Sequence, residues 1–264
     1  MRTRVTIITP TLEINKELIE CAVSAKSFYN PGKNLVVQHI FVLDGGNLDS
    51  SLWNKIQFLE HEFYKVELIK LVSNQGVAFA RNEAIKNSDG DYLMFLDSDD
   101  TFEPQKIAEQ VKLMRQKNAN FSHTGFVEFS DKSGREWKVG AGKNITADIL
   151  KKRCPICTSS VCISREWLAG VMDVSENLFP DQKMRSDWLG WFKLAKKKGF
   201  HPAFVSGYFV RRRIGTNSLT ANKLKTMIYN YRVYRQTGHS IISSSAKAVL
   251  YPIDSLKRRV FHQG

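Results

Sequence analysis

The sequence predicts an α/β fold in which a Rossmann-like, mostly parallel sheet is flanked by helices. Strand-like and helix-like segments alternate over roughly the first hundred residues, which is the pattern of parallel strands joined by helices. Residues 92–96 are almost wholly apolar, as expected of a strand that is buried on both faces. Hydrophobic residues make up 42% of the 264 and charged residues 25%, so the chain can build a packed core.

The first part of the chain is expected to supply the parallel strands. Residues 4–9 predict a buried strand that ends at Pro10, and three more strands are expected at 39–43, 66–72 and 92–96. Helices are expected between them at 13–28, 52–63 and 76–87, the last with Asn74 as its N-cap. Ligands of such sheets bind beyond the carboxyl ends of the strands, where this sequence carries Thr9-Pro10-Thr11, Asp44 and Asp97–Asp100.

From residue 101 the regular alternation gives way to a mixed pattern. Pro104 precedes apolar residues at helical spacing, which predicts a helix on the sheet. Residues 120–130 and 135–139 suggest an antiparallel hairpin. A further strand is expected at 158–164 and a further helix at 187–198. These segments would form a smaller subregion beside the parallel sheet.

Much of the net charge of +13 lies in the last quarter of the chain. Residues 201–264 contain eleven lysines and arginines and one acidic residue, Asp254. This asymmetry suggests an anionic partner (nucleic acid, a membrane surface or a phosphorylated substrate), and the alternative is a solvated basic surface.

The basic C-terminal region also has an amphipathic pattern. Residues 221–236 predict a basic amphipathic helix. Its apolar stripe would consist of Leu224, Met227, Ile228, Tyr231 and Tyr234. A second apolar patch at 249–256 contains Pro252, so only a short or bent helix is expected there.

The cysteines and the apolar runs give no sign of a zinc site, a secreted protein or a membrane span. Cys154 and Cys157 form a CxxC pair without a second pair or histidines at ligand spacing, so reduced cysteines are expected. No apolar run approaches the roughly 18 residues that a membrane-spanning helix needs. The apolar stretch before Pro10 is too short for a signal peptide, so a cytoplasmic location is expected.

The sharpest local feature is Asp97-Ser98-Asp99. At the end of an extended strand, residues two apart point to the same side, so Asp97 and Asp99 are expected to face one side together. Two carboxylates so close repel each other unless a cation accompanies them or one is protonated. Hard oxygen ligands suit Mn²⁺ or Mg²⁺, which predicts a divalent metal held by these two residues. The alternative is a helix-capping loop, which explains one acidic residue better than three.

Several motifs together resemble the family 2 glycosyltransferases with the GT-A fold, over roughly residues 4–220. Each motif is modest alone, but their order and spacing are specific. The matching segments are Ile7-Ile8-Thr9-Pro10-Thr11, Asp44-Gly45-Gly46-Asn47-Leu48-Asp49, Asn74-Gln75-Gly76 with Ala80-Arg81-Asn82-Glu83-Ala84-Ile85, the run GDYLMFLDSDD from Gly90 to Asp100, and Thr158-Ser159-Ser160-Val161.

The resemblance implies a role for each matched position. The residues that would hold the nucleotide part of the donor are Thr9, Pro10, Thr11 and Asp44, the last at the base. Asp97 would lie near the ribose, Asp99 would bind the metal, and Ser98 between them would belong to the donor-binding residues. Arg81 would lie near the diphosphate or brace Asp97. For Asp49 a plain turn role is an equal alternative.

The resemblance also places the catalytic base in a later segment. Residues 185–195 are similar to the family's ED…LWLRLA segment, which puts the base at Asp187, with Asp181 as the second choice and a helix N-cap as the alternative role. Many relatives carry an HxxS segment after this helix, with a histidine that can complete the metal shell. Here Arg211-Arg212-Arg213 occupy that region, and they could clamp the donor diphosphate or form a basic loop.

Together these features predict an inverting, metal-dependent glycosyltransferase that transfers single sugars. The donor would be a nucleotide sugar, with UDP as the expected nucleotide. The acceptor would be a hydroxyl of a cell-envelope glycan of lipopolysaccharide, O-antigen, capsule or teichoic type, free or lipid-linked. Inversion is implied by the resemblance alone. Transfer of single sugars is expected because the QxxRW segment and membrane spans of processive relatives are absent from the sequence.

Residues 1–218 would form the GT-A domain, with a nucleotide-binding half at 1–100 and an acceptor-side half at 101–218. Residues 219–264 would form a basic extension, which could rest on an anionic membrane surface at the inner face of the cytoplasmic membrane. The alternatives are a nucleic-acid-binding protein, a metal-dependent nucleotidyltransferase and an inactive relative. No nucleic-acid partner is expected, because an acidic strand-end cluster repels phosphates unless metal is present.

Overall fold

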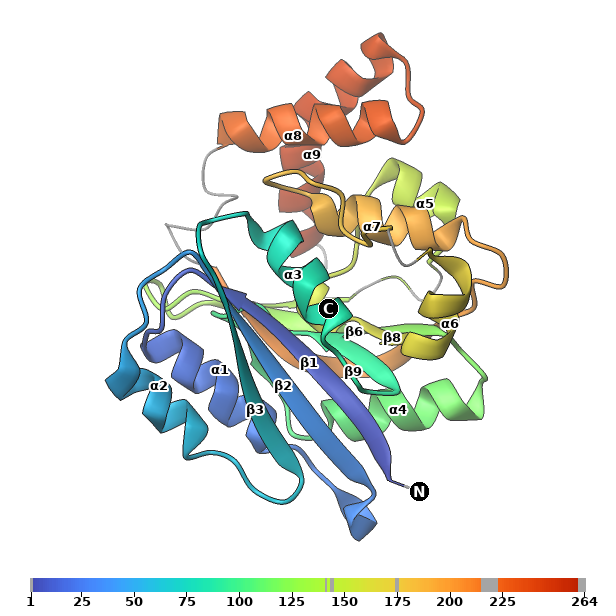
Figure 1. Ribbon diagram of the computed structural model, residues 1–264. Coiled ribbons are helices and arrows are strands. Elements are labelled where there is room, and N and C mark those ends of the chain that lie inside the picture. Colours follow the sequence, from blue (N-terminus) through green and yellow to red (C-terminus); the bar gives the residue numbers. More distant parts are fainter. Residues whose placement is uncertain (1, 141, 143–144, 174–175, 215–222, 261–264) are drawn as a thin grey trace.

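The computed structural model describes residues 2–140, 142, 145–173, 176–214 and 223–260. One mixed sheet runs through the molecule in the order β3-β2-β1-β4-β8-β6-β9-β5, with β7 paired to β6 (Figure 1). Its parallel half consists of β3 (Tyr64–Leu71), β2 (Leu35–Asp44), β1 (Thr3–Thr11) and β4 (Tyr92–Phe95). The predicted fold class is confirmed, and the four parallel strands end at one edge of the sheet.

The other half of the sheet is mixed. β4 pairs antiparallel with β8 (Cys162–Ser164), and β8 pairs antiparallel with β6 (Phe121–Phe129). β6 and β7 (Glu136–Val139) form the predicted antiparallel hairpin, which is confirmed. β9 (Pro202–Arg213) runs parallel to β6 and antiparallel to the short β5 (Thr101–Phe102).

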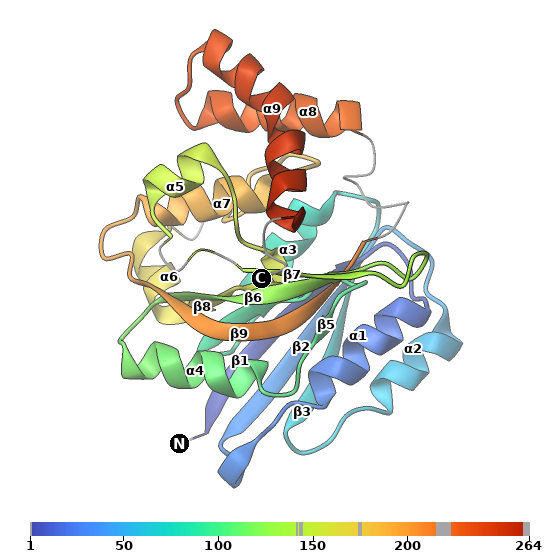
Figure 2. The same cartoon turned by 180° about the vertical axis from the view of Figure 1, so that it is seen from behind.

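Helices cover both faces of the sheet (Figures 1 and 2). On one face lie α1 (Lys16–Lys26), α2 (Ser50–Gln57) and α4 (Lys106–Gln116). On the other lie α3 (Val77–Lys86), α5 (Ala147–Lys152), α6 (Arg165–Val171) and α7 (Ser186–Ala195). The second face has the more aromatic core, in which the ring of Trp191 lies 5.3–5.7 Å from those of Phe95, Phe121 and Phe179.

Two C-terminal helices pack beside α7, and the second of them also contacts β7 of the sheet (Figure 2). α8 (Lys223–Gln236) and α9 (Ile241–Val260) lie against each other as a helical hairpin. The ring of Trp188 on α7 lies 5.4 Å from Tyr234 on α8 and 5.6 Å from Tyr251 on α9. The predicted boundary between residues 218 and 219 lies outside the described residues.

Several predicted elements differ in detail from the structure. The helix expected at 52–63 ends at Gln57, and α3 has Gly76 rather than Asn74 as its N-cap. Residues 158–160 form a short 3-10 helix, so only the end of the strand predicted at 158–164 is extended. α9 continues past Pro252 to Val260 and is longer than expected.

The apolar stripe predicted for the α8 segment is divided between the two faces of the helix. The residues of α8 that are buried are Thr226, Asn230, Val233 and Tyr234. Tyr234 belongs to the predicted stripe, whereas two other stripe residues, Leu224 and Ile228, are 64% and 45% exposed. The stripe is therefore neither wholly buried against the domain nor wholly exposed.

Candidate active site

Three loops meet at the carboxyl edge of the parallel strands. Gly46 after β2 lies so close to the loop after β1 that an added Cβ would be 1.8 Å from the carbonyl oxygen of Leu12. Gly45 has a φ of +72°, and an added Cβ would lie 2.1 Å from the backbone nitrogen of Asn74. Only glycine allows this close approach, because any side chain would push the loops apart. The Asp44-Gly45-Gly46 segment therefore joins the ends of β1, β2 and β3.

Asp44 fixes the start of α3. Its carboxylate is 3% exposed and accepts hydrogen bonds from the backbone N–H groups of Gln75 (2.7 Å) and Gly76 (2.8 Å). A carboxylate has about four lone-pair sites, so two backbone bonds leave it able to accept another donor. These bonds give Asp44 a structural role. The same carboxylate could also accept a hydrogen bond from a nucleotide base.

The acidic cluster lies in a turn, not on a strand. β4 ends at Phe95, and the N–H of Asp100 donates to the carbonyl of Asp97 at 3.0 Å. The expectation that Asp97 and Asp99 end an extended strand is therefore wrong. Their carboxylates nevertheless interact, because burial first and the charge of Asp97 second raise the pKa of Asp99.

Asp100 is the most buried member of the cluster. It is 2% exposed, and burial together with the charges of Asp97 and Asp99 raises its pKa well above the usual value. It accepts hydrogen bonds from the hydroxyl of Ser159 (2.6 Å) and the backbone N–H of Arg213 (3.1 Å). Asp100 has no predicted role of its own. The structure shows that it ties the turn to two other segments.

The short helix at Thr158–Ser160 connects this turn to Asp187. The Ser159 hydroxyl, which donates to Asp100, also accepts the backbone N–H of Asp97 at 3.1 Å. The neighbouring Thr158 hydroxyl donates to Asp187 Oδ2 at 3.0 Å. Residues from β4, the 158–160 segment and α7 are thereby brought to one place. The sequence motif at 158–161 located this segment but did not reveal these bonds.

Arg81 is the nearest positive charge to Asp97. Its guanidinium donates to Asp97 Oδ1 at 2.5 Å, while the residue itself is 5% exposed and lies 5.4 Å from the ring of Phe179. The resemblance implies that Arg81 lies near the diphosphate or braces Asp97. The ion pair agrees with the second of these roles. Its buried Nε has no hydrogen-bond partner among the described residues.

The side chains of β1 are turned into the protein rather than toward the edge. Thr9 Oγ1 is buried and lies 2.8 Å from Nε2 of His39, whose pKa is lowered to about 3 by burial. The hydroxyl of Thr11 donates to the carbonyl of Glu13 at 2.6 Å, and Pro10 is buried. The hydroxyls of Thr9 and Thr11 thus have partners inside the protein. The expectation that Thr9, Pro10 and Thr11 hold the nucleotide stays a prediction.

Asp187 lies in the first turn of α7. It is half-buried, whereas Asp181 is exposed, and the choice of Asp187 over Asp181 as the base stays a prediction. The residue before the helix, Arg185, has a φ of +65° and donates through Nε to Asn230 of α8 at 3.0 Å. A left-handed conformation is uncommon for arginine, and here contacts with the C-terminal hairpin hold it. The start of α7 is therefore braced by α8.

The three arginines at the end of β9 are all paired with acidic residues. Arg211 pairs with Glu136, and Arg212 with Glu128 at 2.9 Å. Arg213 bridges Glu20 (2.8 Å) and Asp131, and its Nε also donates to the carbonyl of Asp99 at 3.3 Å. A clamp on a diphosphate would have to replace some of these pairs, and Arg213 lies closest to the acidic turn.

Asp49 and Ser98 have simpler positions. Asp49 is the N-cap of α2 and accepts the backbone N–H groups of Ser51 (2.9 Å) and Leu52 (3.1 Å). This is the turn role that the sequence left open. Ser98 is half-buried in the acidic turn between Asp97 and Asp99.

Two carboxylates of the acidic turn could hold a divalent metal that keeps other ligands. Asp97 and Asp99 carry the carboxylate oxygens, and the pKa of Asp99 is raised by burial first and by the charge of Asp97 second, so a cation would relieve part of the cost. Among the described residues, no group of three or more histidines, cysteines or acids gathers around a metal position. Magnesium is commonly held by one or two carboxylates together with water and substrate phosphates.

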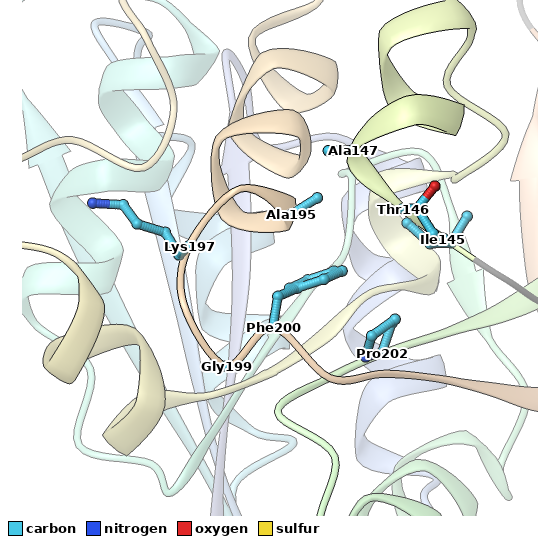
Figure 3. A pocket seen from close by; sticks show the side chains of 8 residues that line it. All are labelled: Ile145, Thr146, Ala147, Ala195, Lys197, Gly199, Phe200 and Pro202. Carbon is cyan, nitrogen blue, oxygen red and sulfur yellow. The ribbon is translucent and has the colours of Figure 1, made fainter.

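A cavity of about 420 Å³ lies away from this turn (Figure 3). It is bounded by the start of α5, the end of α7 and the beginning of β9, with lining residues that include Ile145, Thr146, Ala195, Phe200 and Pro202. None of the predicted site residues lines it. The cavity therefore does not mark the site that the acidic turn forms.

Comparison with known proteins identifies the family. A model of "Glycosyl transferase family 2" matches residues 6–170. A "Putative teichuronic acid biosynthesis glycosyltransferase TuaG" of Bacillus subtilis is 26% identical over 88% of this chain and 87% of that protein. The Escherichia coli protein named "UDP-Glc:alpha-D-GlcNAc-diphosphoundecaprenol beta-1,3-glucosyltransferase WfgD" is 24% identical over 84% of this chain and 83% of its own length.

Other relatives are longer, and solved structures agree in fold. This chain spans 32% of an uncharacterised glycosyltransferase of Rickettsia felis at 31% identity. The crystal structure of S. aureus TarS 1-349 in complex with UDP superposes with a TM-score of 0.63 at 13% identity, over 93% of this chain and 70% of that one. The mannosyltransferase PcManGT from Pyrobaculum calidifontis, in complex with GDP-Man and Mn2+, gives 0.60 at 16% identity over 98% and 74%. The predicted GT-A architecture is confirmed. Because the family model matches more than half of the chain, the protein belongs to glycosyl transferase family 2 and is a glycosyltransferase.

Proposed function

We propose that this glycosyltransferase transfers a single sugar from a nucleotide sugar to a hydroxyl of a cell-envelope glycan, with inversion at the anomeric carbon. The observation that carries the proposal is the link between the acidic turn and Asp187 through the 158–160 segment. Through this link, a carboxylate pair suited to a metal beside the donor diphosphate and a carboxylate suited to an acceptor hydroxyl would share one site.

Asp187 would act as the base. Its carboxylate holds one hydrogen bond, from Thr158, and is half-buried, so it can accept the proton of an acceptor hydroxyl as that oxygen attacks the sugar. Thr158 orients the carboxylate through Oδ2. Attack from the side opposite the leaving diphosphate gives the inverted product, and inversion here rests on the family resemblance.

Asp97 and Asp99 would hold Mn²⁺ or Mg²⁺ beside the donor diphosphate. When bound, the metal would offset the negative charge that develops on the leaving diphosphate. Arg81 holds Asp97 in place through the 2.5 Å ion pair, and Ser159 fixes the backbone of the same residue. Ser98 and the last residues of β1, Thr9, Pro10 and Thr11, would flank the nucleoside, with Asp44 near the base.

The donor and acceptor classes rest on the relatives. UDP is bound in the TarS structure, and WfgD is named for transfer from UDP-Glc to a diphosphoundecaprenol-linked sugar. By analogy a UDP-sugar is the proposed donor, and a lipid-linked or teichuronic-type glycan the proposed acceptor. Such an acceptor would be met at the inner face of the cytoplasmic membrane, where the basic extension at 219–264 would lie.

Calorimetry with UDP tests this assignment. The wild type should bind UDP with Mn²⁺ present and much more weakly without it, and Asp99→Asn should lose the metal-dependent part while keeping the same thermal stability. Asp49→Asn, which changes an acid in a helix cap outside the cluster, is the matched control and should bind as the wild type does. Equal binding of the metal–UDP complex by Asp99→Asn and wild type would show that Asp99 is not a ligand.

A further inference from the structure

The outward face of the first half of α9 is apolar. The six exposed residues of this segment repeat at helical spacing and include no charge; they are Ile241, Ile242, Ser245, Ala246, Val249 and Leu250. The four large side chains among them are 52–83% exposed, with Ile242 the most exposed. The opposite face is the packed one, where Ser244 and Ala248 are buried. We call the six exposed residues the α9 strip.

A contiguous apolar strip on a helix surface has a different meaning from scattered exposed residues. Single exposed hydrophobic residues are normal in folded proteins, whereas a contiguous apolar surface marks an interaction site. Here Leu224 and Ile228 on α8 are also exposed, so each helix of the hairpin leaves large apolar side chains in solvent. The hairpin therefore has an interaction surface that the packing on α7 does not use.

The charges around the strip indicate the kind of partner. Between residues 223 and 251 the sequence has five lysines and arginines and no aspartate or glutamate. Lys225, Arg232 and Arg235 are exposed on α8, and Lys247 is half-buried on α9 itself. Apolar side chains flanked only by positive charge match a surface with an apolar interior and anionic headgroups.

We propose that the α8–α9 hairpin binds the surface of an anionic lipid bilayer, with the α9 strip in the interfacial layer and the basic residues among the headgroups. Among the described residues no helix is long and apolar enough to cross a bilayer, so this contact would be peripheral. The use of such a contact rests on the proposed function, since a lipid-linked acceptor lies in a membrane. The evidence for membrane binding itself, the exposed apolar and basic side chains, does not depend on which reaction the protein catalyses.

The hairpin is also placed to orient the site. Asn230 of α8 accepts a hydrogen bond from Arg185, and Tyr251 of α9 packs on Trp188, so both helices contact the residues that flank Asp187. A hairpin fixed on a bilayer would therefore hold the start of α7 at a defined position relative to the membrane. A lipid-linked hydroxyl could then be presented to Asp187 without free diffusion of the acceptor.

Vesicle sedimentation of the full chain tests the proposal. Wild type should bind vesicles containing phosphatidylglycerol and phosphatidylcholine, bind pure phosphatidylcholine at least about tenfold more weakly, and release as salt rises. The variant Ile242→Gln/Leu250→Gln should lose binding by at least about tenfold, since it removes two apolar anchors and no charge. Both side chains are exposed, so its thermal stability should match that of wild type.

The matched control changes exposed apolar residues on the opposite side of the sheet. Val23→Gln/Phe58→Gln alters residues that are 42% and 88% exposed on and next to α1 and α2, and it should bind vesicles as wild type does. A charge variant, Lys225→Gln/Arg232→Gln, should weaken binding to anionic vesicles and flatten its salt dependence. Turnover of the donor in solution should be the same in all these variants, so a loss of vesicle binding can be told from a loss of activity.

Three results would overturn the proposal. Wild type could fail to bind anionic vesicles, or Ile242→Gln/Leu250→Gln could bind them as well as wild type does. The strip could instead be a contact between two copies: light scattering would then show a dimer that the same variant converts to monomer, without vesicle binding.

Discussion

The buried side chain of Lys106 allows a test of how burial changes the pKa of a charged group in the core. Its side chain is fully buried on α4, where Nζ donates to Gln110 Oε1 at 2.6 Å and lies 4.0 Å from the ring centroid of Phe102. No described carboxylate pairs with it. Burial lowers the pKa of Lys106 from 10.5 to about 7, because the charged form loses its hydration.

The pKa shift predicts how stability depends on pH. The unfolded chain keeps the Lys106 proton up to its ordinary pKa of 10.5, whereas the folded protein releases it near pH 7. The unfolded state then binds more protons between these values, so the free energy of unfolding should rise with pH in this window and be constant below it. From pH 7 to pH 9 this one group contributes a rise of about 2 kcal/mol.

Lys106→Met isolates this contribution. Methionine has a similar length and no charge, and the loss of the bond to Gln110 shifts its stability by an amount that does not depend on pH. Urea unfolding of both proteins at pH 7, 8 and 9 should therefore give a difference that changes by about 2 kcal/mol, with wild type gaining on the variant as pH rises. If the free energies of unfolding of the two proteins changed in parallel with pH, the lowered pKa of Lys106 would be refuted.

Other perturbations test the site and its supports. Thr158→Val removes the hydrogen bond to Asp187 and should lower transfer by about tenfold or more with donor affinity unchanged, whereas Thr158→Ser should restore it. Asp187→Asn should lower transfer by about 10²-fold or more; near-normal transfer would redirect the search to Asp181. Truncation after residue 218 should lower the melting temperature, because it uncovers Trp188 and removes the Asn230 partner of Arg185; an unchanged melting temperature would contradict the bracing of α7.

The parallel half of the sheet could be predicted from sequence because burial on both faces leaves an unmistakable apolar signature. The strand at 92–96 is an example, because it is almost wholly apolar. The antiparallel hairpin at 120–139, which lies in the other half of the sheet, was predicted as well. β9 was not predicted: Gly207 and the arginines at its end interrupt the alternation, and a shift of register with β6 breaks the period. α8 was predicted as a helix, but its buried positions could not be read from the apolar pattern, because they include the polar residues Thr226 and Asn230 beside Tyr234.

The sequence allowed prediction of which residues lie near the candidate site. It did not allow prediction of their conformation or of the hydrogen bonds among them. The order of strands places Asp44 and Asp97 at one edge, and this follows from the alternation of elements. The turn at Asp97–Asp100 and its bonds to Ser159 depend on contacts between residues about sixty apart, which no local pattern encodes. The inward direction of the Thr9 hydroxyl depends on His39, a buried histidine on the neighbouring strand. The assignments of Asp97 and Asp99 to metal and of Asp187 to base stay predictions.

Release of nucleoside diphosphate from a panel of nucleotide sugars is the most direct test of a metal-dependent donor site at Asp97 and Asp99. Wild type, Asp99→Asn and Asp49→Asn would be incubated with UDP-, GDP- and dTDP-sugars, each with Mn²⁺, Mg²⁺ or EDTA, and the diphosphate measured. We expect wild type and Asp49→Asn to turn over at least one UDP-sugar when metal is present, and Asp99→Asn to lose that turnover while remaining folded. Turnover that is equal in EDTA and in Mn²⁺, or equal in Asp99→Asn and wild type, would contradict the metal-dependent site at Asp97 and Asp99.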